Sequence, residues 1–198
     1  MARTASDKIS KILAFVAAAF GLVALVLACV GMGTDQWYQY AVTNSNYISA
    51  SANFFTFCTY NPLTGDKVSC SSRSGNSNPF CSNVPTTAIA NQDDCNNRMR
   101  NASGLGIAGI IFIALGIVVT ILMALGIFSV WFLNFIPGVL FFLASLFMLA
   151  GIAEGSRYLT YNAYSAILYA AGHLVTILAV LLSSLAGGRI AHACKPST

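Results

Sequence analysis

The sequence has little charge. Only 8% of its 198 residues are Asp, Glu, Lys or Arg, whereas 57% are hydrophobic. Soluble domains usually contain about 25% charged residues, so this composition argues against a soluble enzyme and against nucleic-acid binding. The net charge of +4 is confined to the two ends of the chain, because the charges between them cancel. We therefore expect an integral membrane protein whose first partner is the lipid bilayer.

The groupings that carry catalysis are also missing. The sequence has no serine, histidine and acid set, no C-x-x-C pair, no metal-ligand cluster and no glycine-rich phosphate loop. His173 is the one ionisable residue expected in the middle of a membrane span, and no second acid or histidine accompanies it. A structural bond across a helix interface is the favoured role for His173. We expect no enzymatic activity, no metal, no cofactor and no small-molecule substrate.

Four uncharged runs are long enough to cross a membrane, because a helix of about 20 residues spans the hydrocarbon core of about 30 Å. No charge occurs from Asn101 to Ala153, which suits two helices joined by a turn before Pro137. The expected spans are 12–32, 105–126, 135–153 and 163–187, followed by a tail, 188–198. A cleaved signal peptide is the alternative for the first run, although that run exceeds the usual 7 to 15 or so residues.

The basic residues assign an orientation. Lysine and arginine accumulate near both termini, and the turn between the second and third spans has none. The terminal basic residues are Arg3, Lys8, Lys11, Arg189 and Lys195. The positive-inside rule then predicts a multi-pass protein with both termini in the cytoplasm. The segments 34–103 and 154–162 would lie outside the cell, and the plasma membrane is the expected location.

The segment from Thr34 to Ser103 is the only long polar stretch, and its cysteines suit disulfides in an oxidising exterior. These cysteines are Cys58, Cys70, Cys81 and Cys95. Three pairings are possible. A strand-like run, 53–60, is followed by turn residues and by 67–71, which can return antiparallel. That hairpin favours pairing Cys58 with Cys70 and would leave Cys81 and Cys95 for a second bridge.

Several other residues receive individual predictions. The Ser/Asn/Gly-rich run 71–83 predicts an exposed loop, and 86–100 after Pro85 predicts a short helix entering the second span. Cys29 is expected to be a small buried hydrophobe. Cys194, beside basic residues on the cytoplasmic side, is a candidate palmitoylation site, with a plain free thiol as the alternative. Asn101 begins a glycosylation motif, but it abuts a span and is expected to remain unmodified.

Two carboxylates and a set of small residues lie at or within the expected spans. Asp35 and Glu154 fall at the outer ends of spans, where a solvated or hydrogen-bonded carboxylate is favoured over an ion path. Small residues on the second and fourth spans predict close helix packing, either within the bundle or between copies. They are Ala102, Gly106, Gly109, Ala166, Ala170, Ala179, Ser183 and Gly187.

Several stretches, in order along the chain, resemble one superfamily of four-helix membrane proteins: the claudins, the peripheral myelin and epithelial membrane proteins, and the calcium-channel gamma subunits. The run from Gly33 to Trp37, G-T-D-Q-W, is similar to the G-T-D-Y-W of the gamma subunits. The run from Asn53 to Cys58 stands where the family has G-L-W-x-x-C, with Asn53 in place of glycine and Phe55 in place of tryptophan. The stretches 138–144 and 161–170 resemble the third helix and the entry of the fourth.

The residues that carry the family motifs are Gly33, Thr34, Asp35, Trp37, Phe55, Arg98 and Arg100. The resemblance implies an all-α, left-handed transmembrane four-helix bundle topped by an extracellular β-sheet, a claudin-like fold. In this fold Trp37 and the Cys58–Cys70 bridge would anchor the sheet to the bilayer surface. Either Arg98 or Arg100 would be the family's arginine at the entrance to the second helix.

Two functions follow as expectations. The first is a protein that assembles laterally with itself or across cells through the sheet, in a junction, barrier or membrane-organising role. The alternative is an auxiliary subunit of an ion channel or receptor, in which the partner is another integral membrane protein. Claudins generally end in a hydrophobic residue that PDZ domains recognise, whereas this sequence ends in Lys-Pro-Ser-Thr.

Overall fold

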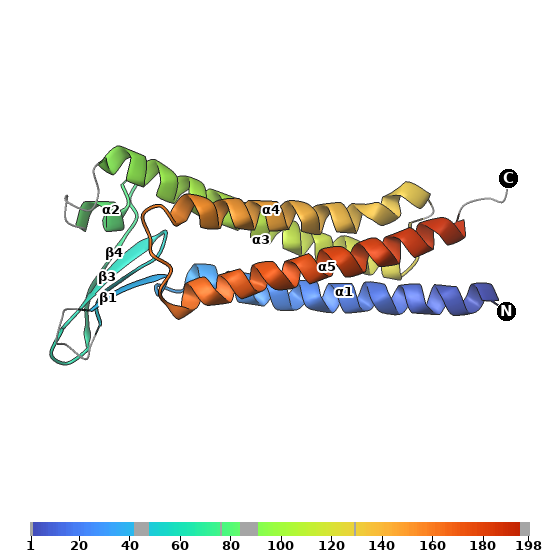
Figure 1. Cartoon of the computed structure of the whole chain (residues 1–198), viewed down its shortest axis with the longest axis horizontal. Coiled ribbons are helices and arrows are strands. Elements are labelled where there is room, and N and C mark those ends of the chain that lie inside the picture. The colour runs from blue at the N-terminus through green and yellow to red at the C-terminus, as the bar shows by residue number, and fades with distance from the viewer. Residues whose placement is uncertain (1, 42–47, 76, 84–90, 129, 195–198) are drawn as a thin grey trace. The chain divides into compact units, whose positions relative to one another are not determined.

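The computed structural model describes residues 2–41, 48–75, 77–83, 91–128 and 130–194 (Figure 1). The helices are α1 (Ala2–Gly33), α2 (Pro79–Asn83), α3 (Gln92–Ala124), α4 (Ile136–Gly155) and α5 (Tyr164–Cys194), with the 3-10 helix η1 (Trp131–Phe135) before α4. The strands are β1 (Tyr38–Ala41), β2 (Ile48–Ala52), β3 (Thr56–Tyr60) and β4 (Lys67–Ser72). They form one antiparallel sheet in the order β1-β2-β3-β4.

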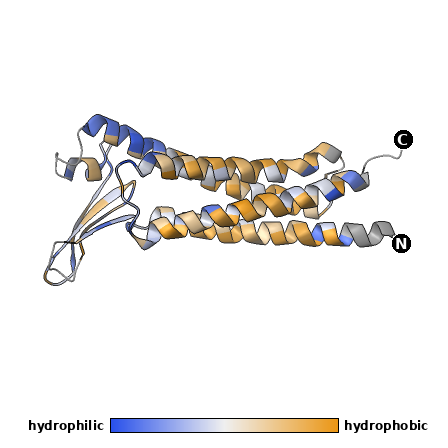
Figure 2. Ribbon diagram, viewed as in Figure 1, coloured by the Kyte–Doolittle hydropathy of each residue, from blue (hydrophilic) through white to orange (hydrophobic). Residues whose placement is uncertain are grey.

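Within these described residues, four helices are long and apolar enough to cross a membrane, which confirms the four spans expected from the uncharged runs. The candidate spans are Lys8–Gly33, Gln92–Ala124, Phe132–Gly155 and Tyr164–His192. Figure 2 shows hydrophobic residues along all four helices, and hydrophilic residues in the first turns of α3. The protein is therefore a tetraspan membrane protein, and the outer faces of these helices contact the lipid bilayer.

The helices extend beyond the expected spans. α3 begins at Gln92 instead of near Leu105, because Asn91 caps its first turn by accepting hydrogen bonds from the backbone N–H groups of Asp93 and Asp94. α3 ends at Ala124, and Gly126 adopts a positive φ of 76° in the turn that follows. α5 continues past Gly187 to Cys194.

The chain divides into two compact units. Residues 1–28, 108–148 and 171–198 form what we call the helical unit, and residues 29–107 and 149–170 form the sheet-bearing unit. All four long helices contribute a segment to each unit.

Small residues let the helices of the helical unit approach closely. Gly21 on α1 and Gly116 on α3 both face Phe141 of α4, and a Cβ built at either glycine would lie 2.9 Å from that ring. Gly172 of α5 lies against the backbone of α1, where its Cβ would be 3.2 Å from the Ala24 carbonyl oxygen. Contacts of this kind replace the hydrophobic effect as the source of helix association in lipid.

His173 has the structural role expected from the sequence. Its Nε2 lies 3.0 Å from Ser145 Oγ, so the two side chains form a hydrogen bond between α5 and α4.

Two sequence-based predictions are wrong. Cys29 is exposed, not buried. Small residues such as Ala24 and Ala28 form the buried face of α1, and Cys29 lies beside that face instead of within it. The run 71–83 is not simply an exposed loop, because α2 forms at its end and buries Phe80 and Cys81. The helix expected over 86–100 is observed from Gln92 onward, and its earlier part, with Pro85, falls outside the described residues.

Candidate functional site

Trp37 anchors the sheet to the helices of the sheet-bearing unit. The indole Nε1–H donates a hydrogen bond to the carbonyl oxygen of Gly31 at the end of α1, over 2.6 Å. Its ring packs against Phe54, Tyr161 and Tyr169, with centroid distances of 4.6, 5.2 and 5.3 Å. Trp37 is only 1% exposed. The first residues after α1 are therefore fixed both by a hydrogen bond and by an aromatic cluster.

Asn53 organises the turn between β2 and β3. Its side-chain oxygen accepts hydrogen bonds from Phe55 N (2.7 Å), Thr56 N (2.7 Å) and Thr56 Oγ1 (3.0 Å). Its Nδ2 donates to the Thr34 carbonyl oxygen over 2.9 Å. Asn53 is buried and both polar atoms of its amide are hydrogen-bonded, so this asparagine has a specific structural use in the turn.

The packing residue of the 53–58 motif is Phe54. Phe54 is 1% exposed and contacts the Trp37 ring, whereas Phe55 is only half-buried. The Phe55 carbonyl oxygen accepts a hydrogen bond from Arg73 N over 2.7 Å. The place of Phe55 in the motif singles it out in the sequence. The alternation of inward and outward side chains along a strand could not have identified Phe54 instead, because residues 53–55 form a turn.

The polar members of the run from Gly33 to Trp37 are tied to distant parts of the sheet-bearing unit. The Thr34 hydroxyl is hydrogen-bonded to Ser165 Oγ at the start of α5, over 2.7 Å. Asp35 accepts a hydrogen bond from Lys67 Nζ on β4, also over 2.7 Å. That bond raises the pKa of Lys67. Gly33 ends α1 in open space, where nothing in the structure requires a glycine.

Both disulfides join the cysteines in the pairs expected from the hairpin. Cys58–Cys70 links directly opposite residues of β3 and β4. Cys81–Cys95 links α2 to the first turns of α3. Asn78 precedes α2, and it accepts a hydrogen bond from Phe80 N and donates one to the Phe54 carbonyl oxygen. α2 is therefore held against the turn that carries Phe54.

An ionic network joins α3 to the end of α4 and the chain that follows it. Arg98 Nε donates to both carboxylate oxygens of Asp94, and Arg98 NH1 donates to Glu154 over 2.9 Å. The Tyr158 hydroxyl donates to Asp94 over 2.5 Å, and this bond raises the pKa of Tyr158. Of the two arginines singled out from the sequence, Arg98 makes these links, while Arg100 is exposed on α3.

The two edges of the sheet differ. At β1, the Asn162 side chain makes the two hydrogen bonds that a neighbouring strand would make. Its Oδ1 accepts from Gln39 N over 2.9 Å and its Nδ2 donates to the Gln39 carbonyl oxygen over 2.8 Å. At the other edge, no strand within the described part of the chain lies beyond β4. All six residues of β4 are exposed.

The directions of the β4 backbone groups follow from the pairing. Arg73 N donates to Phe55 O, so the N–H groups of Arg73 and Ser71 point towards β3. Cys58 and Cys70 have a Cα–Cα distance of 4.1 Å, near the roughly 4.5 Å of a pair without ladder hydrogen bonds. The N–H groups of Cys70 and Ser72 therefore point to the free edge.

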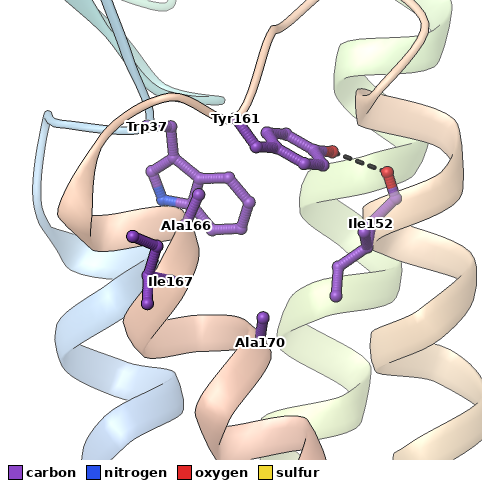
Figure 3. Close-up of a pocket in the computed structure, with 6 residues that line it drawn as sticks. All are labelled: Trp37, Ile152, Tyr161, Ala166, Ile167 and Ala170. Atoms are coloured by element: carbon purple, nitrogen blue, oxygen red, sulfur yellow. Dashed lines mark hydrogen bonds between the residues drawn. The ribbon is translucent and has the colours of Figure 1, made fainter.

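A pocket of about 180 Å³ lies beside Trp37 (Figure 3). We call it the Trp37 pocket. It is lined by Trp37, Ile152, Tyr161, Ala166, Ile167 and Ala170. The Tyr161 hydroxyl donates to the Ile152 carbonyl oxygen over 2.6 Å, as the dashed line in Figure 3 shows. Burial raises the pKa of Tyr161. The lining is almost entirely apolar.

Two further residues named from the sequence lie on helices. Cys194 is the last residue of α5, and its side chain falls outside the described part of the structure. Asn101 is exposed on α3, within the helix. Palmitoylation of Cys194 and the lack of glycosylation at Asn101 remain predictions.

Sequence reasoning missed four residues that hold the site together: Phe54, Asn78, Tyr161 and Asn162. Asparagine near turns is a general signal for side-chain to backbone hydrogen bonds, and it could have identified Asn78 and Asn162 as structural residues. A scan against models of protein families finds no match to this chain, and a search of curated proteins finds none either.

Proposed function

We propose that this tetraspan protein is a divergent member of the claudin superfamily, with no enzymatic activity, which assembles in the plasma membrane through its sheet. Three of the motif residues support the proposal because they hold the sheet: Trp37 bonds to α1, Thr34 to α5 and Asp35 to β4. In this proposal the sheet lies outside the cell and both termini lie in the cytoplasm, in keeping with the basic residues at the ends of the chain.

The observation that carries the proposal is the contrast between the two edges of the sheet. Asn162 closes the β1 edge by bonding to both backbone groups of Gln39. β4 offers the backbone groups of Cys70 and Ser72 to solvent, and Lys67 is its only charged residue. Proteins usually protect such an edge with charges, proline or a covering element. An exposed edge of this kind can bind another strand through main-chain hydrogen bonds.

The partner that we propose for β4 is the same strand of a second copy. An antiparallel β4–β4 pair would satisfy the free backbone groups of both copies and would present a two-fold, self-complementary interface. Lateral assembly of the protein would then proceed edge to edge, with a larger sheet shared by two copies.

A proline at the free edge tests this arrangement. Ser72→Pro removes an N–H that points away from β3, so it leaves the ladder to β3 intact while blocking the edge. Ser72→Ala is the matched control, because it keeps the backbone donor. After reconstitution in lipid, wild type and Ser72→Ala should form dimers or larger arrays in electron micrographs, and Ser72→Pro should be dispersed. Dispersed wild-type monomers, with no enrichment at contacts between expressing cells, would refute self-assembly.

An auxiliary subunit is the second candidate, and the run from Gly33 to Trp37 is the observation that favours it, since it is similar to the gamma-subunit motif. The free edge of β4 would then accept a strand of a channel or receptor. Gentle purification from native membranes separates the two candidates. A stoichiometric channel subunit that is retained with wild type and lost with Ser72→Pro would favour the auxiliary role.

A further inference from the structure

The Trp37 pocket has no polar group that needs water. Trp37 Nε1 is already bonded to Gly31, and the Tyr161 hydroxyl is already bonded to Ile152. The remaining lining consists of aliphatic side chains of α4 and α5. Apolar cavities of about 150 Å³ stay dry and accept apolar molecules as large as benzene. A pocket of about 180 Å³ with this lining therefore favours hydrocarbon over water.

The mouth of the pocket lies on the helix surface that contacts the bilayer. Ile167, which lines the pocket, is 65% exposed, and Ala170 is exposed one turn further along α5. Leu174 continues the same exposed apolar surface at 64%. Because α5 is a membrane-spanning helix, the pocket is continuous with the surface that faces lipid.

The position along α5 determines which part of a lipid can reach the pocket. Ala166, Ile167 and Ala170 fall within about 9 Å of the start of α5 at Tyr164, given a rise of about 1.5 Å per residue. This depth is near one membrane interface, where the first methylene groups of an acyl chain lie. The lining contains no cationic residue to bind a free carboxylate.

We propose that the Trp37 pocket binds the upper part of an acyl chain from a phospholipid of the leaflet next to the sheet. The pocket is too small for the fused rings of a sterol, and a flexible chain can fill it with a few methylene groups. The chain would contact the same indole that bonds to Gly31 and packs on Phe54. Bound lipid would therefore support the residue that anchors the sheet, a role beyond the proposed assembly through β4.

Tryptophan fluorescence in bilayers of brominated phosphatidylcholine tests this proposal. The chain has two tryptophans, so Trp131→Phe leaves Trp37 as the only reporter. Trp37 is 1% exposed, and bromine quenches only at short range, so strong quenching requires a chain beside the ring. We expect bromines at shallow chain positions to quench Trp37 more strongly than bromines near the chain end.

Three variants, made in the Trp131→Phe background, separate entry into the pocket from general contact with lipid. Ala170→Leu fills the mouth and should remove most of the shallow-position quenching, whereas Ile167→Ala widens the mouth and should increase it. Ala153→Leu is the matched control, because Ala153 is exposed on α4 outside the lining, and it should leave quenching unchanged. Circular dichroism establishes that each variant is folded.

Several outcomes would overturn the proposal. Quenching that neither Ala170→Leu nor Ile167→Ala alters would show that no chain enters the pocket. Quenching by a brominated sterol but not by brominated phospholipid would assign the pocket to a different lipid. Quenching that disappears as the ratio of protein to lipid rises would indicate that a second copy covers the mouth.

Discussion

Single side chains, Asn53 above all, determine how the sheet is attached. A glycine in its place could adopt the same turn, but it would leave the backbone N–H groups of Phe55 and Thr56 without the acceptor that Asn53 provides. Buried backbone donors without a partner are costly. The amide also reaches the Thr34 carbonyl oxygen, so one residue connects the β2–β3 turn to the chain leaving α1.

Asn53→Ala should therefore loosen the sheet. The loss of several bonds at a buried site is expected to cost about 2 to 4 kcal/mol. The loosening should appear as faster hydrogen exchange of the β2 and β3 backbone amides, measured in detergent or lipid. Asn61→Ala is the control, because the Asn61 side chain accepts one exposed hydrogen bond from Leu63 N, and its exchange should match that of wild type. Equal exchange in Asn53→Ala and Asn61→Ala would contradict the role of Asn53.

Two tyrosines beside Trp37, the half-buried Tyr161 and the buried Tyr169, should respond oppositely to loss of the hydroxyl. The Tyr169 hydroxyl is buried without a hydrogen-bond partner among the described residues, whereas the Tyr161 hydroxyl donates to Ile152 O. Tyr169→Phe removes an unsatisfied group and should be neutral or stabilising by up to about 1 kcal/mol, while Tyr161→Phe should cost about 1 kcal/mol. Thermal unfolding in detergent compares them, and a larger loss of stability for Tyr169→Phe would refute the assignment.

Among the elements, α2 depends most on contacts made elsewhere in the chain. It has five residues, and so short a helix is not stable alone. The Cys81–Cys95 bridge ties it to α3, and Phe80 packs edge-on against Tyr38 of β1 with a centroid distance of 5.6 Å. α2 thus exists because a covalent link and an aromatic contact hold it.

Removal of the second bridge should melt α2 without disrupting the β3–β4 hairpin. The double variant Cys81→Ala/Cys95→Ala opens a short loop whose closure is worth about 3 kcal/mol. Hydrogen exchange should then increase at 79–83 and in the first turns of α3, and remain slow in β3. The matched variant Cys58→Ala/Cys70→Ala should give the reverse pattern. An unchanged α2 without its bridge would show that packing alone suffices.

The pH dependence of the sheet-bearing unit follows from Lys67 and Tyr158. Their hydrogen bonds to Asp35 and Asp94 raise both pKa values in the folded state. A raised pKa means that the stabilisation is complete below the pKa of the unfolded chain and is lost as the pH rises through the folded value. As the pH rises from neutrality, proteolysis of this unit should therefore stay constant at first and accelerate above about pH 10. Tyr158→Phe should remove the part of this pH dependence that comes from Tyr158. Faster proteolysis already below about pH 9 would contradict an origin in Lys67 and Tyr158.

The success of sequence reasoning differed between elements for physical reasons. Uncharged runs identify membrane helices because charge is excluded from hydrocarbon, and turn residues such as Gly65, with a φ of 77°, identified the β3–β4 hairpin. α2 was missed because its Ser/Asn-rich surroundings favour loops, while burial of Phe80 and the bridge favour a helix. The pocket could not be inferred either, since it depends on how Ala166 and Ala170 pack beside Trp37.

At the scale of the whole molecule, an even number of spans predicts that both termini lie on the same side of the membrane, and the basic residues near them predict that this side is the cytoplasm. The native cysteines can test this orientation. In Cys29→Ala, the four disulfide-bonded cysteines do not react, so Cys194 is the one remaining thiol. A membrane-impermeant maleimide should label Cys194 only after the cells are permeabilised.

A cysteine introduced at Leu63 supplies the opposite readout. Leu63 is 83% exposed in the turn between β3 and β4, so Leu63→Cys should react in intact cells if the sheet is outside. Should Cys194 stay unreactive after permeabilisation until hydroxylamine is added, a thioester is present, as palmitoylation predicts. Labelling of Cys194 in intact cells, or of Leu63→Cys only after permeabilisation, would reverse the orientation. The free edge of β4 would then face the cytoplasm, and assembly between neighbouring cells through that edge would be impossible.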